Sequence, residues 1–137
     1  MTMTAIKNHD VQSVNIAASP EKVFDYIAKP ENLPNWTRAF KKADQKSALL
    51  ITPEGELQID LETRVDANSG TIDWYMTMPD GTVGTAFSRV TEDGNGQAIY
   101  SFVLMAPPVP LEMVEGALSA QIGQLADELK KLQQILN

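Results

Sequence analysis

Four turn signals divide the middle of the chain into segments of strand length. They are TPEGE near residue 53, ANSG near 68, PDGT near 80 and EDGNG near 94. Between them apolar and polar residues alternate, most clearly in ELQIDLETRV, where one face carries Leu57, Ile59, Leu61 and Val65. Period-two alternation broken by glycine-containing turns is typical of antiparallel strands with one buried face. Residues 40–105 are therefore predicted to form an antiparallel meander.

The position of each turn predicts which residues share the buried face. A turn at NS sets Leu61 opposite Met76. A two-residue turn at DG then sets Trp74 opposite Phe87, and Arg89 follows on the same face by parity. Because side chains alternate along a strand, these registers predict an inner face that is apolar across three strands, with Arg89 at its rim.

The last strand, QAIYSFVLMA, is apolar on both faces. One face holds Ile99, Val103 and Met105, and the other holds Tyr100 and Phe102. Turns of either parity fit the preceding DGNG, so the sequence leaves open which face points inward. A strand that is apolar on both sides usually has something covering each side, and a subunit contact would do so.

A helical insert is predicted after the first strand, VQSVNIAA. Ser19 is a good N-cap, and Pro20 fits the first helical position, where its missing N–H costs nothing. Pro30 ends this helix, because the residue before a proline is pushed out of the α region. The stretch ENLPNW leaves room for one more turn before Trp36.

A long amphipathic helix is predicted at residues 111–136, after the strand-breaking APPVP. Its apolar residues recur every three or four positions, which places them on one stripe: Val114, Leu118, Ile122, Leu125, Leu129, Leu132 and Leu136. Such a stripe is expected to pack on a core.

Composition narrows the class of protein. The 137 residues suffice for one domain over residues 1–137, of which 1–8 are expected to be flexible. The chain has no cysteine, and its formal charge of −7 argues against a nucleic-acid surface, which needs clustered Lys and Arg. No segment is apolar over a length that spans a bilayer, so we expect a cytoplasmic protein without integral membrane association.

Catalytic chemistry has few candidates in this sequence. The single histidine, His9, lies in a polar run before the first strand, and the acids Glu54, Glu56, Asp60 and Glu62 alternate onto the face opposite the apolar one. No Ser/His/Asp arrangement, phosphate-binding glycine loop or dinucleotide fingerprint is present. We predict no catalytic residue, no metal site and no cofactor.

A strand, a helix, a short helix, six meander strands and a long C-terminal helix, in that order, resemble the helix-grip fold. The likeness is carried by IAASPEKVFDYIAKPENLPNW near the start, RVTEDGNGQAIYSFVL late in the sheet and LADELKKLQQIL at the end. These segments resemble the START/Bet v 1-like (SRPBCC) superfamily, in particular its bacterial polyketide cyclase/dehydrase-like branch. The resemblance covers nearly the whole chain. It implies an α+β domain in which a curved seven-stranded antiparallel sheet wraps around the long helix.

The resemblance also implies an apolar cavity between sheet and helix, closed at one end by the short helices. With the predicted registers it gives these expected ligand-binding residues: Trp36, Ile59, Leu61, Trp74, Met76, Phe87, Arg89, Leu118 and Ile122. The expected partner is a small hydrophobic or amphipathic molecule, such as a lipid, a polyketide or an aromatic metabolite. Arg89 could bind a ligand carboxylate or extend to solvent. Trp36 could lie at the cavity mouth or only pin the short helix.

Two other functions stay open from the sequence. One is a cyclase or dehydratase acting on polyketides, in which Arg89 polarises a substrate oxygen. The other is an interaction module with a packed core that forms a homodimer through the second face of the last strand, with Tyr100 and Phe102. The missing internal His, Asp or Glu argues against the enzyme, so non-catalytic ligand binding is the leading hypothesis.

Overall fold

The computed structural model describes residues 8–52, 54–107 and 111–137, the side chains of residues 111–117 excepted. The elements follow in the order β1 (His9–Ile16), α1 (Pro20–Ala28), η1 (Pro30–Asn32), α2 (Leu33–Trp36), β2 (Phe40–Ala43), β3 (Ser47–Thr52), β4 (Gly55–Asp66), β5 (Thr71–Thr77), β6 (Val83–Glu92), β7 (Ala98–Met105) and α3 (Leu111–Leu136). The strands form one seven-stranded sheet, β1-β7-β6-β5-β4-β3-β2, in which all neighbours are antiparallel. The predicted α+β helix-grip architecture is confirmed.

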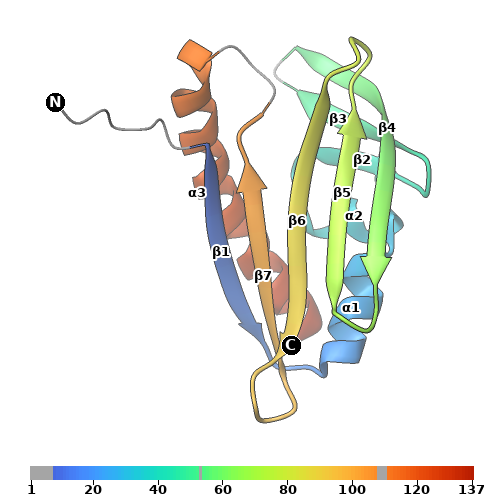
Figure 1. Ribbon diagram of the computed structural model, residues 1–137, viewed down its shortest axis with the longest axis vertical. Coiled ribbons are helices and arrows are strands. Elements are labelled where there is room, and N and C mark those ends of the chain that lie inside the picture. The colour runs from blue at the N-terminus through green and yellow to red at the C-terminus, as the bar shows by residue number, and fades with distance from the viewer. Residues whose placement is uncertain (1–7, 53, 108–110) are drawn as a thin grey trace, which may run out of the picture.

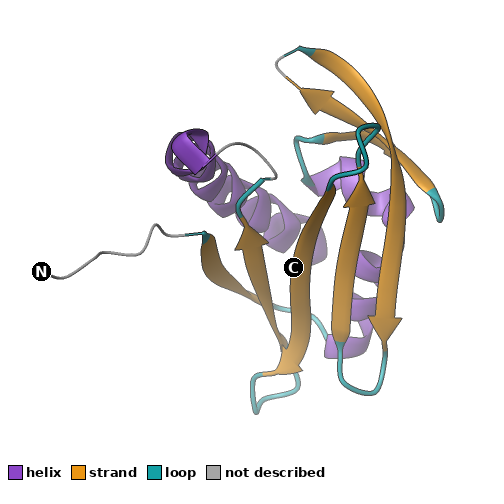
Figure 2. Ribbon diagram, turned by 45° about the horizontal axis from the view of Figure 1, so that its top comes forward, coloured by secondary structure: helices purple, strands orange, loops and turns teal. Residues whose placement is uncertain are grey.

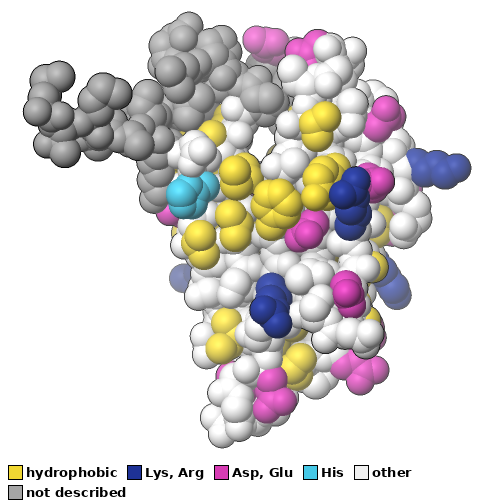
Figure 3. Space-filling view, viewed as in Figure 1, with side chains coloured by type: hydrophobic (Ala, Val, Ile, Leu, Met, Phe, Trp, Pro, Cys, Tyr) yellow, Lys and Arg dark blue, Asp and Glu magenta, His cyan; other side chains and the backbone are white. Residues whose placement is uncertain are grey.

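The helices all lie on one face of the sheet. In Figure 1 they lie behind the strands, with α3 behind β1 and β7 and the short helices behind β4 and β5. Figure 2 shows that the sheet is curved, so that β2 and β3 turn toward α2. This arrangement leaves an outer face of the sheet, which Figure 3 shows, and an inner face that packs against the helices. No helix in the described part of the chain is long and apolar enough to cross a membrane.

The helical insert begins and ends where the sequence predicts. The Ser19 hydroxyl oxygen accepts a hydrogen bond from the Lys22 N–H at 3.2 Å, and Pro20 is the first residue of α1. The helix ends before Pro30, and α2 then ends at Trp36. The insert thus returns the chain to the sheet at β2 and places Trp36 on the inner side, with only 2% of its surface exposed.

The register between β4 and β5 is confirmed, and the register predicted between β5 and β6 is wrong by one residue. Leu61 pairs with Met76 as expected, whereas Trp74 pairs with Ala86 and Asp73 pairs with Phe87. The Met78 N–H bonds the Thr82 carbonyl oxygen, so the hairpin loop has three residues, 79–81. The last of them, Gly81, adopts a φ of 89°. A three-residue hairpin with glycine in the left-handed region adds one residue to the loop, which reverses the faces of every residue that follows.

This shift moves two predicted site residues to the outer face. Phe87 packs edge-on against Tyr75, with ring centroids 6.2 Å apart, and Arg89 is exposed. The Arg89 Nε–H donates to the Ser69 carbonyl oxygen at 3.0 Å. The predicted inner-face position of Phe87 and Arg89 is therefore corrected, and with it the idea that Arg89 reaches a ligand.

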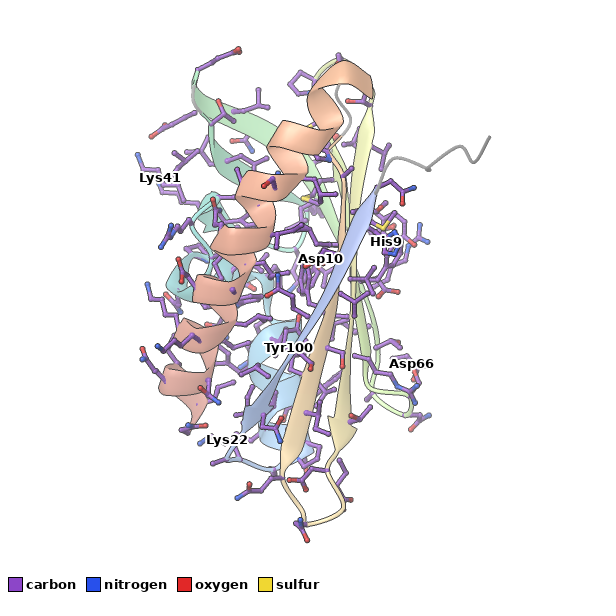
Figure 4. The ribbon with its side chains drawn as sticks, turned by 90° about the vertical axis from the view of Figure 1, so that its left-hand side faces the viewer. His9, Asp10, Lys22, Lys41, Asp66 and Tyr100 are labelled. Carbon is purple, nitrogen blue, oxygen red and sulfur yellow. The ribbon has the colours of Figure 1, made fainter. Side chains whose placement is uncertain are left out.

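The structure also settles which face of the last strand points inward. In β7 the side chains of Tyr100 and Phe102 are buried, with exposed fractions of 0% and 9%. Figure 4 shows Tyr100 on the side of the sheet that faces the helices. A dimer contact through Tyr100 and Phe102 is thus excluded, because both belong to the core.

Helix α3 also covers the free edge of β1. The Gln133 side-chain amide donates to the Asn15 carbonyl oxygen at 2.7 Å, and the Asn137 side-chain oxygen accepts from the Ala17 N–H at 2.9 Å. In addition, the side-chain amide of Gln12 in β1 donates a hydrogen bond to the Ile122 carbonyl oxygen of α3 at 3.0 Å. The bond to Asn15 occupies a backbone carbonyl of the edge strand β1, and the three bonds together fix α3 against the sheet.

Candidate functional site

A cavity of about 240 Å³ lies between the inner face of the sheet, α2 and α3. Its wall is mostly apolar and includes Leu33, Trp36, Phe40, Leu50, Trp74, Met76, Met78, Gly84, Ala86, Phe102, Leu104 and Leu125. The cavity occupies the end of the sheet where β5 passes into β6. Concave, mainly apolar sites with a few polar groups are typical of small-molecule binding.

Aromatic rings form one side of this cavity. Trp36 from α2 stands edge-on to Tyr100, with ring centroids 6.3 Å apart. Trp74 from β5 packs on Phe102 at 5.9 Å, and Phe102 in turn contacts Tyr100 at 6.4 Å. The rings therefore form one connected cluster, which holds both tryptophans in fixed positions at the wall.

Flexible and small residues line the same sheet face beyond Trp74, toward the hairpin between β5 and β6. Met76 and Met78 are half-buried, and their unbranched side chains can adapt to different shapes. Gly84 in β6 faces them, since a Cβ atom there would lie 3.6 Å from the Met78 methyl carbon and 3.7 Å from that of Met76. A larger side chain at this position would project into the cavity.

The polar margin of the cavity comes mainly from α3. Gln121, Gln124 and Glu128 lie in the wall, and so does Thr37, which follows α2. The Glu128 carboxylate accepts a hydrogen bond from the Arg38 backbone N–H at 2.6 Å, which ties α3 to the segment between α2 and β2. Burial raises the pKa of the Glu128 carboxyl, and the hydrogen bonds from Arg38 and Gln124 act in the opposite direction.

Glu128 was missed in the sequence, although a signal was present. Residues 121, 124 and 128 are separated by three and four positions, so they form a second line on the helix beside the leucine stripe. That line is polar, whereas the stripe is apolar. A polar line flanking a core stripe normally faces solvent, and only the curvature of the sheet brings it to the cavity.

Several polar atoms in the interior have no hydrogen-bond partner among the described residues. They are the indole nitrogens of Trp36 and Trp74, the Thr63 hydroxyl and the Tyr100 hydroxyl. Burial raises the pKa of the Tyr100 phenol, although the nearby Ser88 hydroxyl acts to lower it. Tyr100 is therefore neutral across the physiological range and does not act as a base.

The remaining predicted site residues divide between the cavity wall and the core around it. Trp36, Trp74 and Met76 lie in the wall, whereas the wall does not include Ile59, Leu61, Leu118 or Ile122. Ile59, Leu61 and Leu118 are buried in the core, and Ile122 lies on the side of α3 that faces β1.

Other sites in the described structure offer fewer groups for catalysis or ligand binding. His9 is exposed and bonds the neighbouring Asn8 side chain at 2.8 Å. A hollow of about 590 Å³ near β2 and β3 is larger than the cavity, but residues with charged side chains, including Glu31, Lys41, Lys42 and Asp44, line it at the surface. In the described ranges no group of three His, Asp or Glu side chains could hold a metal ion.

A curved antiparallel sheet that holds a long helix over an apolar cavity defines a START-like helix-grip protein. A family model described as "Polyketide cyclase / dehydrase and lipid transport" matches residues 9–134, and the chain belongs to this family. No curated protein sequence matches the chain.

Solved structures share the fold at low sequence identity. A START superfamily protein from Mycobacterium smegmatis is 16% identical with a TM-score of 0.71, over 96% of this chain and 100% of that one. The protein XoxI from Bacillus cereus is 19% identical with a TM-score of 0.70, over 95% and 96% of the two chains. The di-domain ARO/CYC BexL of the BE-7585A biosynthetic pathway is 12% identical with a TM-score of 0.70, over 93% of this chain and 46% of that one. At these identities the likeness shows the fold alone.

Proposed function

We propose that the protein binds a small hydrophobic or amphipathic molecule in the cavity between sheet and α3. The observation that carries this proposal is the cavity itself, a space of about 240 Å³ with an aromatic wall, two adaptable methionines and a polar margin at one side. Membership of a family described by cyclisation, dehydration and lipid transport supports the same class of ligand. Trp36, Trp74 and Met76 are proposed to contact it.

Intrinsic fluorescence provides a direct test. The chain has two tryptophans, and both lie in the cavity wall. Titration with octanol, an uncharged probe, is expected to change the tryptophan emission in a saturable manner. Native mass spectrometry of the gently purified protein should show any bound molecule directly as an added mass.

A cavity-filling variant identifies the site. Gly84→Leu is expected to abolish octanol binding, because its side chain would occupy the space beside Met76 and Met78. Gly123→Leu is the matched control, since Gly123 is exposed on α3 and a Cβ there would meet nothing within 4 Å. Saturable binding that persists in Gly84→Leu would show that octanol binds elsewhere.

A cyclase or dehydratase is the second candidate, and Glu128 favours it. A carboxyl whose pKa is raised by burial at the wall of an apolar cavity could exchange a proton with a bound substrate. Under this hypothesis the protein should accelerate the loss of water from a linear aryl triketone, as followed by mass spectrometry. Glu128→Gln should abolish that acceleration, whereas a binding protein would release the triketone unchanged.

A further inference from the structure

The cavity carries charge of only one sign. Among its described wall residues, Glu128 is the one ionisable side chain, and neither lysine nor arginine contributes to the wall. The other polar wall side chains, those of Thr37, Thr85, Gln121 and Gln124, are uncharged. A ligand in the cavity therefore meets one carboxyl group and no cation in the wall.

The nearest arginine does not supply the missing positive charge. The Arg38 guanidinium pairs with Asp127 at 3.3 Å, and the two side chains are 64% and 66% exposed. Only the backbone N–H of Arg38 is directed at Glu128, at 2.6 Å from the carboxylate oxygen. This N–H and the Arg38 charge favour the ionised form of Glu128, whereas burial and the Asp127 charge oppose it.

We propose that Glu128 selects ligands by charge, so that the cavity accepts an apolar molecule with a hydroxyl or ammonium head and rejects the carboxylate with the same body. A donor head can form a hydrogen bond to the Glu128 carboxylate, and an ammonium adds Coulomb attraction. A ligand carboxylate would instead bring two negative charges together in a partly desolvated space whose wall contains no cation. This inference depends on the proposed binding function, and it names the class of ligand.

Three probes with one eight-carbon body test the selection in the wild-type protein. Octylammonium, octanol and octanoate are titrated separately at neutral pH and low salt, below their aggregation limits, with tryptophan emission as the readout. Octylammonium is expected to bind at least about tenfold more tightly than octanoate, and the affinity of octanol should lie between the two. Added salt should reduce the difference, because it screens charges at the margin.

Variants assign the effect to Glu128. Glu128→Gln keeps the shape and removes the charge, so the ratio of octylammonium to octanoate affinity should fall to about twofold or less. Glu92→Gln is the matched control: Glu92 is exposed at the opposite end of β6 from the cavity, and its removal changes the net charge equally. That control should keep the wild-type ratio.

A second variant should change the affinity ratio in the opposite direction, and its result does not depend on whether Glu128→Gln folds. Gln121→Glu adds a carboxylate to the same wall and should increase the ratio above that of the wild type. Equal affinity for octanoate and octylammonium, or a ratio that neither variant changes, would overturn the charge selection while octanol binding upheld the binding function. Failure of octanol and the other two probes to bind would overturn both.

Discussion

The inner face of the sheet is packed at one end and hollow at the other, although the same strands β5, β6 and β7 run through both. At the packed end Ile72, Ala98 and Tyr100 are fully buried, and α1 adds Val23 and Ile27 with no exposed surface. At the hollow end Met76, Met78 and Leu104 are only half-buried and face the cavity. The packed end can therefore supply most of the stability, which allows the hollow end to keep the space in which we propose that a ligand binds.

The largest expected difference concerns leucine truncation at the two ends. Leu132→Ala in α3 should lower the free energy of unfolding by about 3–4 kcal/mol, because Leu132 is fully buried at the packed end. Leu104→Ala should lower it by only about 1 kcal/mol, since that side chain already borders empty space. Urea denaturation of both variants measures the two losses. Equal losses would show that the ends do not differ in packing.

Two glycines in the hairpins provide the next comparison. Gly70 joins β4 to β5 at the packed end, with a φ of 75°, and a Cβ atom there would lie 2.2 Å from the Val90 carbonyl oxygen. Gly81, at the hollow end, has a φ of 89° but nothing within 4 Å of that position. Gly70→Ala should therefore lower the free energy of unfolding by about 2–3 kcal/mol, and Gly81→Ala by about 1 kcal/mol.

Thermal denaturation followed by circular dichroism can compare these two alanine variants directly. Both substitutions place alanine in the left-handed region, so the difference between them isolates the contact with the backbone of β6. A loss at Gly81→Ala as large as at Gly70→Ala would attribute the effect to the backbone angle alone.

The same two hairpins show why the fold was predictable and the site only partly so. The register between β4 and β5 was predicted correctly, because the observed loop, residues 67–70, is centred on the Asn68–Ser69 pair that the turn signal suggested. In PDG, however, Pro79 can occupy the first turn position and Gly81 the left-handed one, which makes a three-residue loop. One extra loop residue leaves the order of strands unchanged but moves Phe87 and Arg89 to the other face.

The cavity margin depends on tertiary curvature, which no local pattern records. Trp74 and Met76 were predictable wall residues, since they share the apolar face of β5. Glu128 lies outside the apolar stripe of α3, and its position at the cavity follows from the way the sheet turns toward α2. The strands and helices were thus determined by local patterns, whereas the inward-facing charge depended on how they assemble.

A smaller effect is expected from the buried phenol at the packed end. The Tyr100 hydroxyl has no hydrogen-bond partner among the described residues, and a buried hydroxyl without one is unfavourable. Tyr100→Phe should therefore raise the free energy of unfolding by up to about 1 kcal/mol in urea denaturation. Tyr26→Phe is the control, because the Tyr26 hydroxyl oxygen accepts a hydrogen bond from Asn35 at 3.3 Å. This substitution should therefore give no gain in stability. A clear loss at Tyr100→Phe would indicate that its hydroxyl is bonded.

The smallest effect is a pH dependence at the hollow end. Burial raises the folded pKa of Glu128 above its unfolded value, so the folded state holds this proton more tightly. The wild type therefore loses stability as the pH rises from the ordinary glutamate pKa, roughly 4.3, through the higher folded pKa. Glu128→Gln removes this titration, and at neutral pH it should be more stable than the wild type by less than about 1 kcal/mol, because solvent screens a half-buried group.

The advantage of Glu128→Gln should vanish in acid, where wild-type Glu128 is protonated and also uncharged. Urea denaturation of both proteins at neutral pH and below the ordinary glutamate pKa measures this change, with Glu92→Gln as the control for net charge. The opposite result would be a stability difference between Glu128→Gln and the wild type that is less favourable to the variant at neutral pH than in acid. It would mean that the hydrogen bond from the Arg38 N–H lowers the pKa of Glu128 more than burial raises it. In that case the carboxylate would be a structural tie between α3 and the segment after α2, and the hollow end would be held together by the same group that we propose selects its ligand.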